Sequence, residues 1–145
     1  MNLTEHFTLD ELVASQVAAR RHIDNRPSQA IIDNLRRVAG VLEQIRAAVG
    51  KPITVSSGYR SPALNTAVGG ARDSAHLQGL AADISVSGLA PKALAKAIIA
   101  AGVQFDQLIY EGTWVHIGLA SGKLRNQILT ATFKQGGVVY SAGIS

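Results

Sequence analysis

The chain has 145 residues, about one domain's worth, and its 47% hydrophobic content is enough for one sizeable core. Only 17% of the residues are charged, which is too few for a disordered tail. The absence of cysteine excludes disulfides, iron–sulfur clusters, thiolate zinc sites and cysteine nucleophiles, so any metal must bind His, Asp or Glu. The net charge of +4 favours polyanionic partners slightly, but the basic residues are scattered and aromatic residues are few, so we expect no nucleic-acid partner.

The sequence predicts neither a membrane span nor a secretion signal. Its apolar runs, such as 97–101, are far shorter than the roughly 18 residues that a membrane helix needs. The first five residues lack the basic-then-apolar pattern of a signal peptide. We therefore expect a single soluble domain over 1–145, monomeric and without integral membrane contact. We also expect it to be made in the cytoplasm and released by another factor if it acts elsewhere.

Helix signals dominate the first third of the chain. A capping box at the start of 8–15 predicts a short helix there, and the polar segment 16–27 predicts a surface loop. A serine cap and a glycine just past the end bound a long predicted helix over 28–49. Alternating steps of four and three residues place one apolar stripe along this helix, made of Ile31, Leu35, Val38, Leu42, Ile45 and Val49.

The rest of the chain alternates strand signals with one further helix. Strands are predicted over 53–56, 80–86, 105–111, 114–119, 127–133 and 138–140, and a helix over 91–102. Two-residue turns are predicted at Gly112-Thr113 and Gly136-Gly137. The segment 57–79 is rich in glycine, and such a long loop is typical of a functional site or of disorder. The expected fold is α+β, with the early helices packed on a mostly antiparallel sheet.

Two of the four histidines lie where they could take part in chemistry. His76 falls in the glycine-rich loop and His116 in a predicted strand, whereas the other two belong to the N-terminal helical part. Strand alternation places Asp83 and His116 on the non-core faces of their strands. If these strands are neighbours, His76, Asp83 and His116 converge on one cation, and three such ligands with an open fourth position are typical of catalytic zinc. The ordinary alternatives are a packed or surface histidine and a solvated aspartate.

Three motifs carry a resemblance to a known family. They are Ser56-Ser57-Gly58-Tyr59-Arg60-Ser61-Pro62, Ser74-x-His76-x-x-Gly79-x-Ala81-x-Asp83 and Trp114-Val115-His116-Ile117. Over about residues 28–120 the chain resembles the zinc D-Ala-D-Ala carboxypeptidases. These LAS-type enzymes include phage L-Ala-D-Glu endolysins and D-Ala-D-Ala dipeptidases, and they share a metal fold with the Hedgehog signalling domain. The resemblance implies this zinc fold, a Zn²⁺ cofactor and a peptidase that cuts peptidoglycan stem peptides at the cell wall, as a phage or prophage enzyme of host lysis.

The resemblance also implies roles for individual residues. His76, Asp83 and His116 would be the zinc ligands, and Arg60 would hold substrate and stabilise the developing oxyanion. The residues expected to contact substrate are Ser74, Tyr59 and Trp114. Simpler roles are also open: an ion pair between Arg60 and Asp73, a turn hydrogen bond for the serine, and packing for the tryptophan.

The general base is where this chain departs from the family pattern. Some members carry a glutamate three residues before the last histidine ligand, but Thr113 occupies that position here. Glu111 is the candidate that would take a proton from the attacking water, unless it is a solvated turn residue. Asp106 is the reserve, or it could orient a histidine ligand.

Two questions stay open at this stage. The chain could instead be a non-catalytic zinc-containing module that binds the cell wall, although the retention of Arg60 and Glu111 argues against this. The bond that is cut is also open, because carboxypeptidases that release D-Ala and endopeptidases that cut between L-Ala and D-Glu use the same ligand set.

Overall fold

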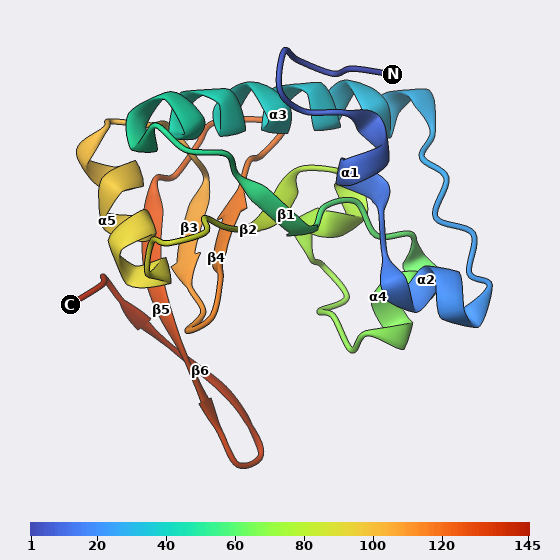
Figure 1. Ribbon diagram of the computed structural model, residues 1–145. Helices are drawn as coiled ribbons and strands as arrows, with labels where there is room; N and C mark the ends of the chain where they lie inside the picture. Colours follow the sequence, from blue (N-terminus) through green and yellow to red (C-terminus); the bar gives the residue numbers. More distant parts are fainter.

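The computed structural model describes residues 1–145 (Figure 1). Its first helix, α1 (Leu9–Val13), begins with the predicted capping box, in which Thr8 and Glu11 bond each other's backbone N–H. The prediction of a loop over 16–27 is wrong in its first half, because α2 (Gln16–Arg21) forms there. The side chain of Ser15 caps α2 by accepting a hydrogen bond from a backbone N–H of the helix's first turn.

The long helix α3 (Gln29–Val49) is confirmed, together with both of its ends. Ser28 caps its first turn, and Gly50 ends it in a left-handed conformation (φ 67°) that favours glycine. The middle of the predicted apolar stripe is fully buried, whereas the two end residues are half-buried. The helix lies along one side of the molecule (Figure 1).

Six strands form one sheet in the order β1-β2-β4-β3-β5-β6. Their bounds are β1 Thr54–Ser57, β2 Ala81–Ser85, β3 Gln107–Tyr110, β4 Val115–Gly118, β5 Gln127–Lys134 and β6 Gly137–Ala142. The expectation of a mostly antiparallel sheet is only partly right, because β3 and β5 pair in parallel. The reason is that the end of β4 lies beside the start of β3. The connection 119–126 crosses β3 at its start, so β5 begins next to the start of β3 and runs in the same direction.

The glycine-rich segment 57–79 contains two short helices, α4 (Pro62–Ala67) and the 3-10 helix η1 (Ala75–Gln78), where a loop was predicted. In both cases a serine directly before the helix accepts a hydrogen bond from its first turn. Proline at the first position of α4 adds a preset backbone angle. The segment is therefore ordered around local caps, and it leads directly into β2.

The hydrophobic core lies on one face of the sheet. Helix α3 and helix α5 (Pro91–Ala100) contribute to it together with the inward faces of β2, β3 and β4. The predicted core faces are confirmed, since Ala82 and Ile84 are fully buried and Val115 and Ile117 are at most 2% exposed. No helix has the length and apolar character needed to cross a membrane. The opposite face of β2 and β4 carries Asp83 and His116 beside the small residues Ala81 and Gly118.

Candidate metal centre and active site

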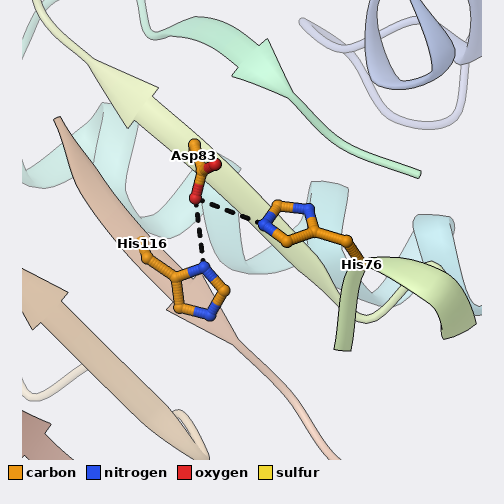
Figure 2. A group of neighbouring side chains, drawn as sticks. All are labelled: His76, Asp83 and His116. Atoms are coloured by element: carbon orange, nitrogen blue, oxygen red, sulfur yellow. Dashed lines mark hydrogen bonds and ion pairs between the residues drawn. The ribbon is translucent and has the colours of Figure 1, made fainter. Parts of the chain in front are cut away.

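Three side chains meet on this polar face: His76, Asp83 and His116, which we call the ligand cluster (Figure 2). Asp83 on β2 lies directly opposite His116 on β4, so both side chains project from the same face of the sheet. His76 comes from η1, just before β2. Its Nε2 lies 3.3 Å from Asp83 Oδ1, and His116 Nδ1 lies 3.0 Å from the same oxygen. The condition that the two strands be neighbours is thus met.

A backbone carbonyl determines which nitrogen of His76 faces the cluster. Nδ1 lies 2.7 Å from the carbonyl oxygen of Gly58, which can only accept, so Nδ1 carries the hydrogen and donates it. In the neutral ring, Nε2 then presents a lone pair to Asp83 Oδ1, which is also an acceptor. Two acceptors 3.3 Å apart repel each other unless a proton or a metal cation lies between them. The arrangement therefore requires positive charge at its centre.

The donor set and its spacing fit a zinc ion. All three ligand atoms lie within 4.8 Å of one another. A tetrahedral zinc ion with bonds of about 2.0–2.1 Å would hold neighbouring ligand atoms about 3.4 Å apart, close to the two separations given above. Two imidazoles and one carboxylate leave the fourth position open, as in catalytic zinc sites. The cluster could therefore hold zinc without large rearrangement.

Arg60 neutralises the outer side of the cluster. Its Nη2 lies 3.4 Å from Asp83 Oδ2, the carboxylate oxygen that the histidines do not use, and both side chains are largely buried. Its other nitrogens donate to Ser57 Oγ at 3.1 Å and Asn65 Oδ1 at 3.2 Å. Arg60 does not form the alternative ion pair with Asp73, because its guanidinium points toward the ligand cluster. Sequence analysis gave Ser57 only as part of a motif and did not single out Asn65, because neither residue type by itself indicates its partner.

Burial alone would raise the pKa of Asp83, but a proton or positive charge shared with His116 and His76 outweighs burial and holds the pKa well below its usual range. The carboxyl group is therefore ionised at neutral pH. An ionised oxygen is what a metal cation needs as a ligand. The electrostatics of the cluster and its geometry thus agree.

Two glycines of the motifs are required by close packing. Gly58 contacts the backbone of α1, so that a Cβ there would lie 2.9 Å from the carbonyl carbon of Leu12. Gly79 has φ +67°, and its Cβ would lie 2.8 Å from the Ile31 side chain on α3. Gly58 presents its carbonyl to His76, and Gly79 ends η1. Both glycines therefore help to position the histidine.

Glu111 and Trp114 lie in the same cleft as the ligand cluster, on the turn between β3 and β4. The indole Nε1 of Trp114 donates to Glu111 Oε2 at 2.9 Å, which fixes the carboxylate. Burial raises the pKa of Glu111, and the negative charge of Asp83 adds to the shift. A carboxylate whose pKa is raised in this way is a stronger proton acceptor than an exposed glutamate.

Comparison with known proteins agrees with this geometry. The family model for peptidase M15 matches residues 5–118, which include the ligand cluster, Arg60 and Glu111. The chain belongs to the peptidase M15 family. Over 57 residues it is also 47% identical to the zinc D-Ala-D-Ala carboxypeptidase of Streptomyces albus G. That match spans 39% of this chain and only 22% of the relative's length.

Membership of the M15 family, a family of peptidases, confirms the family resemblance that the three motifs predicted, whereas the phage endolysin subtype stays a prediction. Zinc, the predicted cofactor, is the metal named in the relative, and the ligand cluster has the donors to bind it. The matched region ends at β4, so β5 and β6 lie outside it. These two strands form a hairpin that projects from the body of this M15 family member (Figure 1).

Asp106, the reserve base, is engaged elsewhere. Its carboxylate accepts from the backbone N–H, Nε and Nη2 of Arg125, the last at 2.8 Å. The hydrogen bonds from Arg125 lower the pKa of Asp106, which weakens it as a proton acceptor. Asp106 makes no hydrogen bond to either cluster histidine, so it does not orient a metal ligand.

The remaining predicted residues occupy different positions relative to the cleft. Ser74 lines it, but its hydroxyl is used to accept from the backbone N–H of His76 at 3.2 Å, the simpler role considered above. Tyr59 is only 8% exposed and packs in the core, with an edge at a neighbouring groove. Trp114 lines the cleft and also packs against Phe133, with ring centroids 6.3 Å apart.

The cleft around the ligand cluster has a volume of about 690 Å³. One of its walls comes from the β5–β6 hairpin, which sequence analysis did not connect with the site. The sequence analysis predicted a strand over 127–133 and did not assign a partner to either of its faces. The apolar face of the hairpin lines the cleft because β5 pairs in parallel with β3, and this pairing was not predicted.

Proposed function

We propose that this chain is a zinc-dependent hydrolase of peptidoglycan stem peptides, of the D-Ala-D-Ala carboxypeptidase or the L-Ala-D-Glu endopeptidase type. The observation that carries the proposal is the convergence of the ligand cluster and a fixed carboxylate, Glu111, in one cleft. The zinc carboxypeptidase from Streptomyces albus G supports the substrate class, because its name specifies a bond found in such peptides.

In this proposal His76, Asp83 and His116 hold the metal. When bound there, zinc supplies a Lewis acid for the scissile carbonyl and makes a water molecule more acidic. The site then carries a net charge of about +1, which suits a peptide rich in carboxylates. Gly58 and Arg60 support the ligands and do not bind the metal themselves. The carbonyl of Gly58 fixes the tautomer of His76, and Arg60 holds the outer oxygen of Asp83.

Glu111 moves the proton. Its carboxylate accepts the proton of the attacking water and later passes it to the nitrogen of the leaving amine, so that the enzyme returns to its starting state. The indole of Trp114 keeps one carboxylate oxygen in place during both transfers. Arg60 was predicted to stabilise the oxyanion, but its bonds to Ser57, Asn65 and Asp83 favour a positioning role.

The test is a digest of purified peptidoglycan with the zinc-loaded protein, analysed by mass spectrometry. Released D-Ala identifies a carboxypeptidase, and new amino-terminal D-Glu identifies an endopeptidase. A chelator should abolish either product, and added zinc should restore it. If the protein binds zinc fully but cleaves nothing, the proposal fails, and a non-catalytic module that binds the cell wall takes its place.

A role in host lysis during phage or prophage growth is a further part of the proposal, and it rests on the resemblance to phage endolysins. It predicts that the purified protein clears a suspension of cells whose outer layers have been permeabilised. Cleavage of isolated peptidoglycan without any clearing of such cells would remove this role and leave the activity itself intact.

A further inference from the structure

The β5–β6 hairpin presents an apolar face to the cleft. Cross-strand pairs put Phe133 opposite Val138 and Ala131 opposite Tyr140, so these side chains share one face. Phe133, Val138 and Tyr140 line the cleft although they are 55%, 41% and 53% exposed. The other face carries mainly threonine, serine and lysine. An exposed apolar face is costly in water, so its position beside the ligand cluster points to contact with substrate.

A second groove, of about 720 Å³, adjoins the cleft on the other side of the cluster. The two share the residues at their junction, namely Arg60, Val68, Asp83 and Trp114. The second groove is lined by β1 and by the segment between α1 and α2, whereas the cleft is lined by β5 and β6. Since β1 and β6 are the two edges of the sheet, the cleft and the groove together cross it and pass the ligand cluster on β2 and β4.

The two ends of this path differ in chemistry. Arg20, on α2, lines the second groove, and the only acidic residue there is Asp83, whose carboxylate already pairs with Arg60 and the histidines. The guanidinium of Arg20 is therefore a positive charge without a partner in the groove, and it suits a carboxylate. The hairpin end offers hydrocarbon and aromatic surface instead.

We propose that a peptide substrate lies across the sheet through both the cleft and the second groove, with one of its carboxylates on Arg20 and an aliphatic portion on the apolar face of the hairpin. This inference rests on the proposed function and adds to it that the enzyme binds residues on both sides of the scissile bond. The bound carboxylate belongs either to the chain terminus of the peptide or to a side branch of it.

The hairpin end is tested by a matched pair of variants, Val138→Ser and Val139→Ser. The two residues are neighbours and are 41% and 50% exposed, but only the first lines the cleft. We expect Val138→Ser to raise KM for a stem peptide about tenfold, as expected when one apolar contact in a binding site is lost, with kcat little changed. Val139→Ser should leave both constants unchanged. Equal effects of the two variants would overturn the assignment of this wall.

The charged end is tested by Arg20→Gln beside Arg21→Gln, its exposed neighbour that does not line the groove. Arg20→Gln should raise KM up to about fivefold at low salt, and the effect should vanish at high salt, because a partly exposed ion pair is screened. Arg21→Gln should have no effect. If the peptide terminus supplies the carboxylate, amidation of the terminus raises KM for the wild type as Arg20→Gln does and leaves KM of Arg20→Gln unchanged. If a side branch does, amidation of that branch does so instead. A wild-type KM that responds to neither amidation would refute the role of Arg20.

Failure of this inference can be told apart from failure of the proposed function. Trp114 is the only tryptophan and lies at the junction of the cleft and the groove, so its fluorescence reports peptide binding without any turnover. A wild-type protein that cleaves nothing contradicts the proposed function. If it still binds the peptide, and Val138→Ser and Arg20→Gln weaken that binding while their partners do not, the two-sided binding path stands.

Discussion

Replacing Glu111 with Gln separates proton transfer from the rest of the site. Glutamine has nearly the same shape, and its side-chain oxygen can still accept the 2.9 Å hydrogen bond from Trp114. It cannot accept a proton from water at neutral pH. A positioned general base contributes about 10²- to 10⁴-fold, so kcat should fall by that factor, equivalent to about 3–5 kcal/mol in the activation barrier.

Stability and metal content should not fall with the rate. Burial raises the pKa of Glu111, which means that the charged form is disfavoured in the folded state, so a neutral glutamine should leave the free energy of unfolding unchanged or slightly higher. The assay is the steady-state rate on the bond identified in the peptidoglycan digest, with zinc content and thermal unfolding measured on the same samples. Glu5→Gln, at a side chain that is 84% exposed, is the matched control and should behave as the wild type.

The reasoning is refuted if Glu111→Gln, with a full zinc content, keeps its rate within tenfold of the wild type. The base would then have to be another group in the cleft, and Asp106→Asn would be the next variant to examine. A loss of rate accompanied by a loss of zinc would instead mean that the glutamate supports the metal site.

Three further changes test the supports of the site. Arg60→Lys removes the guanidinium that joins three acceptors, so zinc affinity should fall about 10- to 100-fold in competition with a chelator; an unchanged affinity contradicts the positioning role. Gly58→Ala should lower the free energy of unfolding by about 1–3 kcal/mol, measured with denaturant, because the new Cβ meets the backbone of α1. Gly40→Ala lies within helix α3 with open space around it, and it should raise the free energy of unfolding by at most about 1 kcal/mol. Arg125 holds the pKa of Asp106 below its ordinary 3.8, so the stability advantage of the wild type over Asp106→Asn should be full above about pH 4 and disappear as the pH falls through the lowered pKa; an advantage that grows in acid excludes this linkage.

The parts of the structure that follow local rules were predictable from the sequence. The apolar stripe of α3 and the two-residue alternation of β2 and β4 identified the core faces, and they also placed Asp83 and His116 on the opposite face. Once the strands pair in register, those two side chains must meet. His76 was a candidate third ligand from its place in the glycine-rich segment, and its exact position depends on the short helix η1, which was not predicted.

Other parts depend on contacts that no local pattern specifies. The helix α2 is only six residues long, so its local signals are few: a serine cap at its start and a left-handed residue, His22, at its end. Arg60 could pair with any nearby carboxylate, and the choice of Asp83 over Asp73 is made by the fold. The parallel placement of β5 next to β3 likewise follows from the path of residues 119–126, where Ser121-Gly122 indicates a turn but nothing specifies the direction of the next strand.

The sheet order also separates the ligand cluster from the apolar face of the β5–β6 hairpin. The ligands on strands stand on β2 and β4, the hairpin is attached to β3, and β3 therefore lies between them. The backbone of β3 can stay the same while the residues or the length of the β5–β6 hairpin change, since the hairpin pairs with no ligand-bearing strand. An exchange of the hairpin that keeps an aromatic partner for Trp114 at the position of Phe133 would therefore change this wall of the cleft and leave the pairing of the ligand-bearing strands unaltered.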